Sequence, residues 1–319
     1  MDNILRIKQL TIPLSPKDSE INAFVEKGYL IGKKIGQGSY ATVHLADYVD
    51  TTKTNPKKVR LACKIFDKKK ASKNFLNRFL TRELEILAQI NNKYIISLHS
   101  ILQRDTRVFI FMGYAENGDL LDYIHRNGPI PENHARLWFK QMICGLHYLH
   151  GINIAHRDLK CDNILLSAKF NIKLADFGFA RFCVDSRNKK ILSDTYCGSS
   201  TYAAPEVIIG TPYDPKLSDV WSLGVILFVM LNTTLPFDDI SCVDLVHNQM
   251  TKNWAFQSRV RDNLSKMVKS LVRHILEPNI NKRFTLENIR KHEWLKLHKE
   301  KSSTPAQLLN KSKKQKKRK

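Results

Sequence analysis

The first third of the chain carries the short apolar and polar runs that are typical of strands. Five segments rich in β-branched and aromatic residues predict strands, at 29–35, 41–48, 60–66, 95–102 and 108–114. Between the third and fourth of them, apolar residues three and four positions apart predict one helix. They are Phe75, Phe79, Leu80, Leu84, Leu87 and Ile90.

The pattern changes after Gly118, where helical spacing dominates. Pro131 and Glu132 mark the start of a long helix, and a second long helix is predicted over 219–231. The apolar run 223–231 is too short to span a bilayer and predicts a buried helix. Strands first and helices later predict an α+β fold of two unequal lobes. We expect residues 1–28 to be an extension before the main fold.

Composition adds little to this picture. Of the 319 residues, 43% are hydrophobic and 26% are charged, as in folded soluble proteins. The six cysteines are scattered without a Cys-x-x-Cys pair, which favours reduced thiols in the cytosol or nucleus over disulfides. We therefore predict a cytoplasmic protein.

The net charge of +22 raises the alternative of a nucleic-acid-binding protein. Part of the excess lies in the segment 296–319, which we predict to be a basic, disordered tail. The tail is either a nuclear import signal or a solubilising end. The remaining excess is spread along the chain without interleaved aromatic residues, so we predict no specific nucleic-acid partner and no membrane partner. Salt dependence of nucleic-acid binding would separate the alternatives.

Glycines and a lysine in the strand region suggest phosphate chemistry. The run Gly36-Gln37-Gly38 lies between two strands, where glycines let a backbone approach phosphates. An ordinary hairpin turn is the alternative, and a Rossmann site fits worse because a strand follows. Lys64 interrupts an apolar strand, so it faces either solvent or an anionic partner. Glu83, in the predicted helix, is the candidate partner.

The most informative segment is 155–163, which reads Ala-His-Arg-Asp-Leu-Lys-Cys-Asp-Asn. Asp158 can accept the proton of an attacking hydroxyl, Lys160 can neutralise charge on a moving phosphoryl group, and Asn163 can hold Mg²⁺. A solvated polar loop is the alternative. This alternative is less favoured because Asp176, in an Asp-Phe-Gly run, supplies a second metal ligand.

The motifs follow one another in the same order as in the eukaryotic protein kinases, so residues 29–295 resemble that family. The resemblance implies a small β-rich N-lobe over 29–113, a larger helical C-lobe over 114–295 and ATP in the cleft. It also implies that Glu206 pairs with Arg283 and that Asp219 braces the catalytic loop. The implied catalytic residues are Asp158, Lys160, Asn163, Lys64 and Glu83, and the implied Mg²⁺ ligands are Asn163 and Asp176. The implied ATP-binding residues are Ile35, Gly36, Gln37, Gly38, Ser39, Val43, Ala62, Lys64, Met112, Gly113, Ala115, Asp119, Leu165 and Asp176.

Two positions depart from the family pattern. Ala41 stands where a third glycine is usual. Gly113 replaces an acidic residue in the segment 113–115, which the resemblance implies to be the hinge that binds adenine. Neither change should abolish ATP binding, since Ala41 adds one methyl group and the hinge binds adenine through its backbone.

Other residues indicate the type of kinase. Lys160 resembles the serine/threonine enzymes, and Ser199 lies where such enzymes keep a hydroxyl that contacts Asp158 and Lys160 and selects the substrate hydroxyl. Thr195 is the implied regulatory phosphosite, whose phosphate would lie close to Arg157. The strings at 176–180, 192–199, 202–206, 218–225 and 235–239 are most similar to the testis-specific serine/threonine kinases, within the calmodulin-dependent-kinase-like group.

This resemblance implies a monomeric enzyme that phosphorylates serine and threonine on protein substrates. It also implies an upstream activating kinase and a role in spermatogenesis. Asp119 and Asp162 stand where related enzymes read basic residues, which suggests arginine upstream of the target. The alternative is a kinase-fold scaffold with little activity. The discriminating residues are all present, namely Lys64, Asp158, Asn163 and Asp176.

Overall fold

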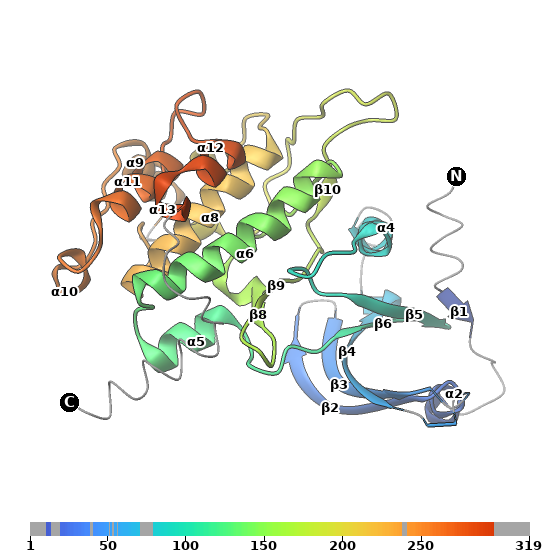
Figure 1. Cartoon of the computed structure of the whole chain (residues 1–319). Coiled ribbons are helices and arrows are strands. Elements are labelled where there is room, and N and C mark those ends of the chain that lie inside the picture. The colour runs from blue at the N-terminus through green and yellow to red at the C-terminus, as the bar shows by residue number, and fades with distance from the viewer. Residues whose placement is uncertain are drawn as a thin grey trace, which may run out of the picture. The chain divides into compact units, whose positions relative to one another are not determined.

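The structure, a computed structural model, forms two compact units, Met1–Tyr114 (unit 1) and Ala115–Lys319 (unit 2) (Figure 1). It describes residues 11–13, 20–38, 41–50, 52, 54–55, 57–70, 79–237 and 241–296. Among the predicted features, Ser39, residues 71–78 and the tail beyond residue 296 lie outside these ranges.

A six-stranded sheet forms the centre of unit 1, in the order β1-β5-β6-β4-β3-β2. Its five sequence-predicted strands are confirmed and pair antiparallel. One boundary was wrong, because the strand predicted from Ile95 begins at Leu98. Ile95 and Ile96 are buried, but a turn in which Ile95 N–H donates to the Asn92 carbonyl keeps them out of the ladder. The strands are β1 (Thr11–Pro13), β2 (Tyr29–Gln37), β3 (Ala41–Val49), β4 (Lys58–Asp67), β5 (Leu98–Arg104) and β6 (Arg107–Gly113).

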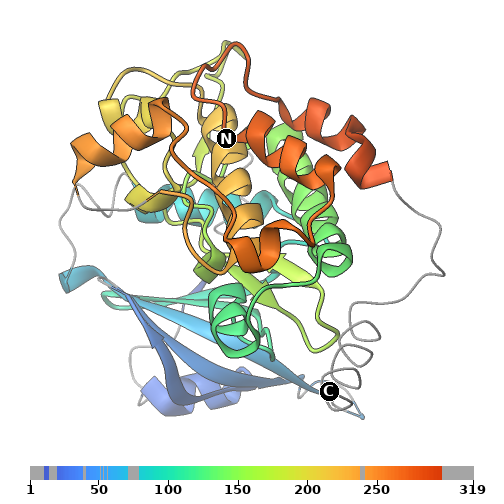
Figure 2. The ribbon, with the colours of Figure 1, turned by 90° about the vertical axis from the view of Figure 1, so that its left-hand side faces the viewer.

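The segment before residue 29 adds two elements that the sequence did not predict. Strand β1 pairs parallel with β5. Helix α2 (Glu20–Glu26) lies against one face of the sheet, as the blue helix shows in Figure 2. Its Phe24 is 3% exposed and packs edge-on against Phe109, with ring centroids 4.5 Å apart. This burial makes α2 part of the core of unit 1.

The predicted helix of unit 1 is α4 (Thr81–Gln89). Of the residues in the predicted spacing, Leu80 and Leu87 are buried and Leu84 and Ile90 are partly buried, whereas the buried Ile86 was not predicted. Glu83 is buried on the same helix at 4% exposure. A charged side chain at that depth needs a partner.

Unit 2 is mainly helical. The predicted start of the long helix α6 at Pro131 and Glu132 is confirmed, and α8 is a core helix in which 16 of the 18 residues are buried. By length and composition α8 could cross a membrane, but 89% of its apolar window is buried inside the protein. The longer helices are α5 (Leu120–Asn127), α6 (Glu132–Gly151), α8 (Pro215–Asn232), α9 (Cys242–Met250) and α11 (Lys266–Ile275).

Short elements complete unit 2 and place its loops. Two small antiparallel sheets pair β7 with β10 and β8 with β9. The α+β class with a strand-rich and a helix-rich unit is therefore confirmed. These elements are β7 (Ile154–Ala155), β8 (Ile164–Leu166), β9 (Ile172–Leu174), β10 (Arg181–Phe182), α7 (Pro205–Ile209), α10 (Ser258–Arg261), α12 (Leu286–Lys291) and α13 (Glu293–Lys296).

Candidate active site

The glycine motif of unit 1 lies where β2 turns into β3. Gly36 pairs with Val43 and Gln37 with Thr42, and the register shifts along β2. The Gly38 N–H donates to the Ala41 carbonyl at 2.8 Å, which closes the turn. The hairpin alternative and the phosphate interpretation are therefore compatible, since the motif forms a hairpin with exposed glycine-containing backbone.

Lys64 and Glu83 form the ion pair that the sequence suggested. The Lys64 Nζ and Glu83 Oε1 atoms lie 2.8 Å apart, with the side chains 14% and 5% exposed. Strand β4 and helix α4 therefore present one cation held by one buried carboxylate. The interpretation of Lys64 as a solvent-facing edge residue is wrong.

Four of the residues predicted to bind ATP share a single sheet face of unit 1. Val43 is opposite Lys64 and Ala62 is opposite Met112, and opposed residues in antiparallel strands point to the same side. Ala62 and Lys64 are two residues apart, so they share that side too. The register thus groups the predicted residues around the Lys64 ammonium, and Ile35 lies on the neighbouring β2 with 42% exposure.

The contacts of Gly113 with Ser97 explain why a glycine stands at this position, where the family pattern has an acidic residue. Its N–H donates to the Ser97 carbonyl at 2.9 Å. A Cβ atom at this position would lie 2.9 Å from the Ser97 hydroxyl oxygen. A larger residue would therefore displace Ser97, so the glycine fits this turn of the chain.

In unit 2, Asp219 holds the backbone of the catalytic loop, residues 156–158, by hydrogen bonds, as predicted. Its Oδ2 accepts the His156 N–H at 2.9 Å and its Oδ1 accepts the Arg157 N–H at 2.7 Å. His150 Nε2 lies 2.9 Å from the same carboxylate. Arg157 has a φ of 67°, and these bonds stabilise the strained backbone that directly precedes Asp158.

Asp158 is the centre of a polar cluster at 7% exposure. Its Oδ1 accepts bonds from the Ser199 N–H (3.0 Å) and hydroxyl (3.3 Å), and its Oδ2 accepts one from Asn163 Nδ2 (3.0 Å). Lys160 Nζ donates to the Ser199 hydroxyl at 3.0 Å and lies 3.6 Å from Asp158 Oδ2. The predicted contact of Ser199 with both Asp158 and Lys160 is confirmed.

Asn163 and Asp176 offer oxygen ligands of the kind that Mg²⁺ uses. Because the Asn163 amide nitrogen donates to Asp158, its Oδ1 is the acceptor atom that could hold a cation. Asp176 has a φ of 62°, and the next residue, Phe177, is buried against His156 with ring centroids 5.0 Å apart. The His156 ring also bonds the Ala175 carbonyl at 3.0 Å, so the buried ring anchors the Asp176 backbone.

Asp119 has a structural task besides the predicted one. Its carboxylate accepts the Asp122 N–H at 2.8 Å and so caps the start of α5. Burial raises its pKa, and the nearby Asp122 and Asp162 carboxylates raise it further. Asp119 also forms a strand-like bridge with Leu165, and Ala115 is buried at 8% exposure.

Two arginines, Arg157 and Arg181, contact the segment around Thr195, and the sequence predicted only Arg157 there. Arg157 Nη2 donates to the Thr195 carbonyl at 3.1 Å and to Cys197 Sγ. Arg181 donates to the Ser193 hydroxyl at 3.1 Å, and its pKa is lowered by burial and by repulsion from Arg157. Arg181 carried no motif signal, because only the turn of β10 brings it to this place.

Gly198 fixes the path of the chain between Thr195 and Ser199. It has a φ of +90°, and a Cβ atom there would lie 2.7 Å from the Arg157 carbonyl oxygen. Only glycine accepts both the backbone angle and this close approach. The closeness lets the Ser199 N–H reach Asp158.

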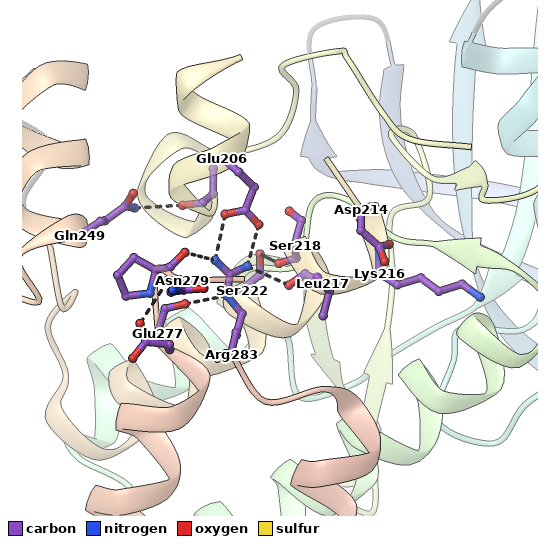
Figure 3. A network of polar contacts seen from close by, with 12 residues as sticks. Glu206, Asp214, Lys216, Leu217, Ser218, Ser222, Gln249, Glu277, Asn279 and Arg283 are labelled. Atoms are coloured by element: carbon purple, nitrogen blue, oxygen red, sulfur yellow. Dashed lines mark hydrogen bonds and ion pairs between the residues drawn. The ribbon is translucent and has the colours of Figure 1, made fainter. Parts of the chain in front are cut away.

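The predicted Glu206–Arg283 pair is confirmed and is bidentate, at 2.6 and 2.9 Å (Figure 3). The Arg283 guanidinium also donates to the carbonyls of Glu277 and Leu217, at 2.9 and 3.3 Å, and it lies 5.0 Å from the Trp221 ring centroid. Its side chain is 0% exposed. The pair ties α7 to the chain that precedes α12.

Comparisons with known proteins agree with this geometry. The family model of the protein kinase domain matches residues 29–295. Testis-specific serine/threonine-protein kinase 2 of Mus musculus is 41% identical over 283 residues, covering 88% of this chain and 77% of the relative. Mouse testis-specific serine/threonine-protein kinase 3 is 42% identical over 85% of this chain and 97% of its own length. The human kinase 4 of the same name is 40% identical over 85% and 83%.

Proposed function

We propose that this chain, which belongs to the protein kinase family, transfers the γ-phosphoryl group of ATP to serine and threonine hydroxyls of protein substrates through Asp158. The chain is a protein kinase of the serine/threonine type. The observation that supports this chemistry most is the cluster in which Asp158, Lys160 and Ser199 contact one another.

The cluster suits the transfer of a proton and a phosphoryl group. The substrate hydroxyl would attack the γ-phosphorus while Asp158 accepts its proton and the bond to the ADP oxygen breaks. The Lys160 ammonium would neutralise charge on the transferring group, and Ser199 keeps both side chains oriented. We assign Ser199 the selection of serine and threonine over tyrosine, because it shapes the space beside Asp158.

The family uses ATP, generally with Mg²⁺, and the predicted residues of each unit suit these groups. In unit 1, the backbone of Gly36 and Gly38 would contact phosphates and the Lys64 ammonium would bind them, fixed by Glu83. In unit 2, Asn163 and Asp176 would hold Mg²⁺, which shields phosphate charge when bound. The adenosine contacts are assigned to Ile35, Val43, Ala62, Met112, Gly113, Ala115, Asp119 and Leu165.

We further propose that phosphorylation of Thr195 by an upstream kinase activates the enzyme. Arg157 is 8% exposed, and among the described residues neither it nor Arg181 has a carboxylate within ion-pair distance. Within the same described ranges the Arg157 Nε has no hydrogen-bond partner. Two partly buried guanidinium groups beside Thr195 form a receptor for the phosphate, which would add charge-assisted hydrogen bonds and order the segment.

The biological setting follows from the relatives, which are named as testis-specific kinases. We propose a role in spermatogenesis for a monomeric, cytoplasmic enzyme, with nuclear entry directed by the basic tail. Asp119 and Asp162 interact electrostatically and favour substrates with arginine upstream of the target.

The test is a peptide array incubated with γ-labelled ATP and Mg²⁺, followed by identification of the phosphorylated amino acids. Wild type should produce phosphoserine and phosphothreonine without phosphotyrosine. Asp158→Asn, which keeps the hydrogen bonds to Ser199, should lower the rate by about a thousandfold or more. Equal rates for the two proteins would refute the assignment of Asp158, and a phosphotyrosine product would refute that of Ser199.

A further inference from the structure

A hollow of about 460 Å³ lies in unit 1, and its lining shares only Gln37 and Gly38 with the residues assigned to catalysis and ATP binding. It is bounded by the β2–β3 hairpin, the end of β4, the short helix η1 (Lys68–Lys70) and the β5–β6 turn. Its volume is within the range of ligand pockets in proteins. The lining residues are Gln37, Gly38, Ala41, Thr42, His44, Ile65, Asp67, Lys69, Lys70, Thr106 and Arg107.

The hollow opens on the sheet face opposite to Lys64. Thr42 pairs with Ile65, and Ile65 pairs with Phe109, on which α2 packs. These residues alternate with Val43 and Lys64 along their strands, so they point to the other side. A ligand in the hollow would therefore not occupy the face that carries the Lys64 ammonium.

Cations dominate the lining. Lys69, Lys70 and Arg107 carry three positive charges against the single carboxylate of Asp67. Both lysines are exposed, and in the described part of the chain neither forms an ion pair. The carboxylate of Asp67 accepts the Lys69 N–H at 3.0 Å, which fixes the turn that presents the two ammonium groups.

Neutral donors complete the lining. Thr42 and Thr106 contribute hydroxyl groups. His44 adds no further donor, because its Nδ1 lies 3.1 Å from the Gly32 carbonyl and carries the hydrogen of the neutral ring, so that Nε2 is an acceptor. Several cations and hydroxyls around one concave space suit a tetrahedral group with several acceptor oxygens better than a planar carboxylate.

We propose that this hollow binds the phosphoryl group of a phosphorylated serine or threonine on a peptide segment. A single concave site suits one such group. A nucleic acid is less suited, because the lining includes no Phe, Tyr or Trp on which a base could stack. Bound peptide would also contact Gln37 and Gly38 and restrain the glycine turn, which should lower the KM for ATP. This last consequence rests on the proposed function, whereas the binding itself does not.

The test measures binding to the full chain without ATP, by fluorescence anisotropy. The probe is a fluorescein-labelled peptide, Gly-Gly-phosphoserine-Gly-Gly, and its unphosphorylated form is the reference. The phosphopeptide should bind at least about tenfold more tightly than the reference, and Lys69→Glu/Lys70→Glu should remove this advantage. Asp67→Asn keeps the acceptor for the Lys69 N–H and removes the negative charge, so binding should tighten by about threefold.

Two controls locate the site. Lys57→Glu reverses one charge just before the opposite end of β4, half the change of the double variant, and should leave the affinity unchanged. Lys160→Ala removes the cation beside Asp158 and should also leave it unchanged, which separates the hollow from the reaction centre. Circular dichroism checks that the charge-reversed protein is folded, and Lys70→Ala, with an expected loss of about threefold, serves if it is not.

Several results would overturn the proposal. One is phosphopeptide affinity that Lys69→Glu/Lys70→Glu leaves intact, or that Lys160→Ala abolishes. Another is displacement of the probe by inorganic phosphate at equal concentration, which would assign the hollow to free phosphate. A single-stranded oligonucleotide that binds more tightly, with the same dependence on Lys69 and Lys70, would assign it to nucleic acid.

Discussion

Arg283 and Arg157 are buried guanidinium groups of the same unit with different surroundings. Arg283 is 3% exposed, and its bonds to the Glu206 carboxylate and to backbone carbonyls satisfy its donors. Arg157 is 8% exposed and bonds to the Thr195 carbonyl and a sulfur atom, while its Nε has no partner among the described residues. Burying a charge is costly unless an opposite charge meets it.

The difference separates a structural site from one that we propose to be regulatory. The Arg283 site is complete in the chain itself and holds two segments of unit 2 together. Among the described residues no carboxylate forms an ion pair with Arg157 or Arg181, although Asp194 interacts electrostatically with Arg181, and phosphorylation of Thr195 would supply an anion there. The distance within an ion pair does not distinguish such roles, because the exposed Arg290–Glu287 pair is also 2.6 Å long.

The largest effect is expected when the complete site is broken. Arg283→Met leaves the Glu206 carboxylate without its cation and should lower the free energy of unfolding by about 3–5 kcal/mol. Arg290→Met removes a pair whose side chains are 42% and 53% exposed, and should cost less than about 1 kcal/mol. Thermal and urea unfolding measure both variants. Similar losses for the two would mean that burial does not govern the strength of these pairs.

Lys64 forms an ion pair with a carboxylate as Arg283 does, but the Lys64 side chain is 14% exposed. Lys64→Arg keeps the charge and should shift the melting temperature by less than about 3 °C. The longer, planar guanidinium would not place a donor where the ammonium binds phosphate, so kcat/KM should fall by about a hundredfold. Steady-state kinetics and calorimetry check this. Full activity would show that Lys64 has only a structural task.

Asp219 is a buried carboxylate that backbone N–H groups, rather than a side-chain cation, stabilise. In Asp219→Asn an amide NH₂ would face one of these donors, which should tilt the catalytic loop and lower kcat by about tenfold. Asp214→Asn is the matched control, since asparagine also caps helices and the end of α8 that it caps lies outside the loop. Kinetics at a temperature where both variants are folded would compare them. Equal kcat values for the two variants would show that the Asp219 carboxylate does not control the geometry of the catalytic loop.

The sequence was sufficient for the features that depend on local pattern. Runs of β-branched and aromatic residues located β2, β3, β4 and β6, and apolar spacing and helix-start residues located α6 and α8. A lysine in an apolar strand indicated the pair Lys64–Glu83, and the family resemblance implied the pair Glu206–Arg283. The packing of Phe24 on Phe109 escaped prediction, because it joins residues far apart in the chain whose contact no short pattern encodes. The same holds for Arg181, which only the pairing of β10 with β7 brings beside Arg157.

The most direct measurement compares the protein phosphorylated at Thr195, verified by mass spectrometry, with the same sample after phosphatase treatment. Phosphate between Arg157 and Arg181 should raise the melting temperature by a few degrees, about 2–4 °C per kcal/mol, and kcat by at least about tenfold. Thr195→Ala should behave like the treated sample, and Arg181→Met should lose most of the rise in melting temperature. Identical melting temperature and kcat before and after treatment would contradict the account.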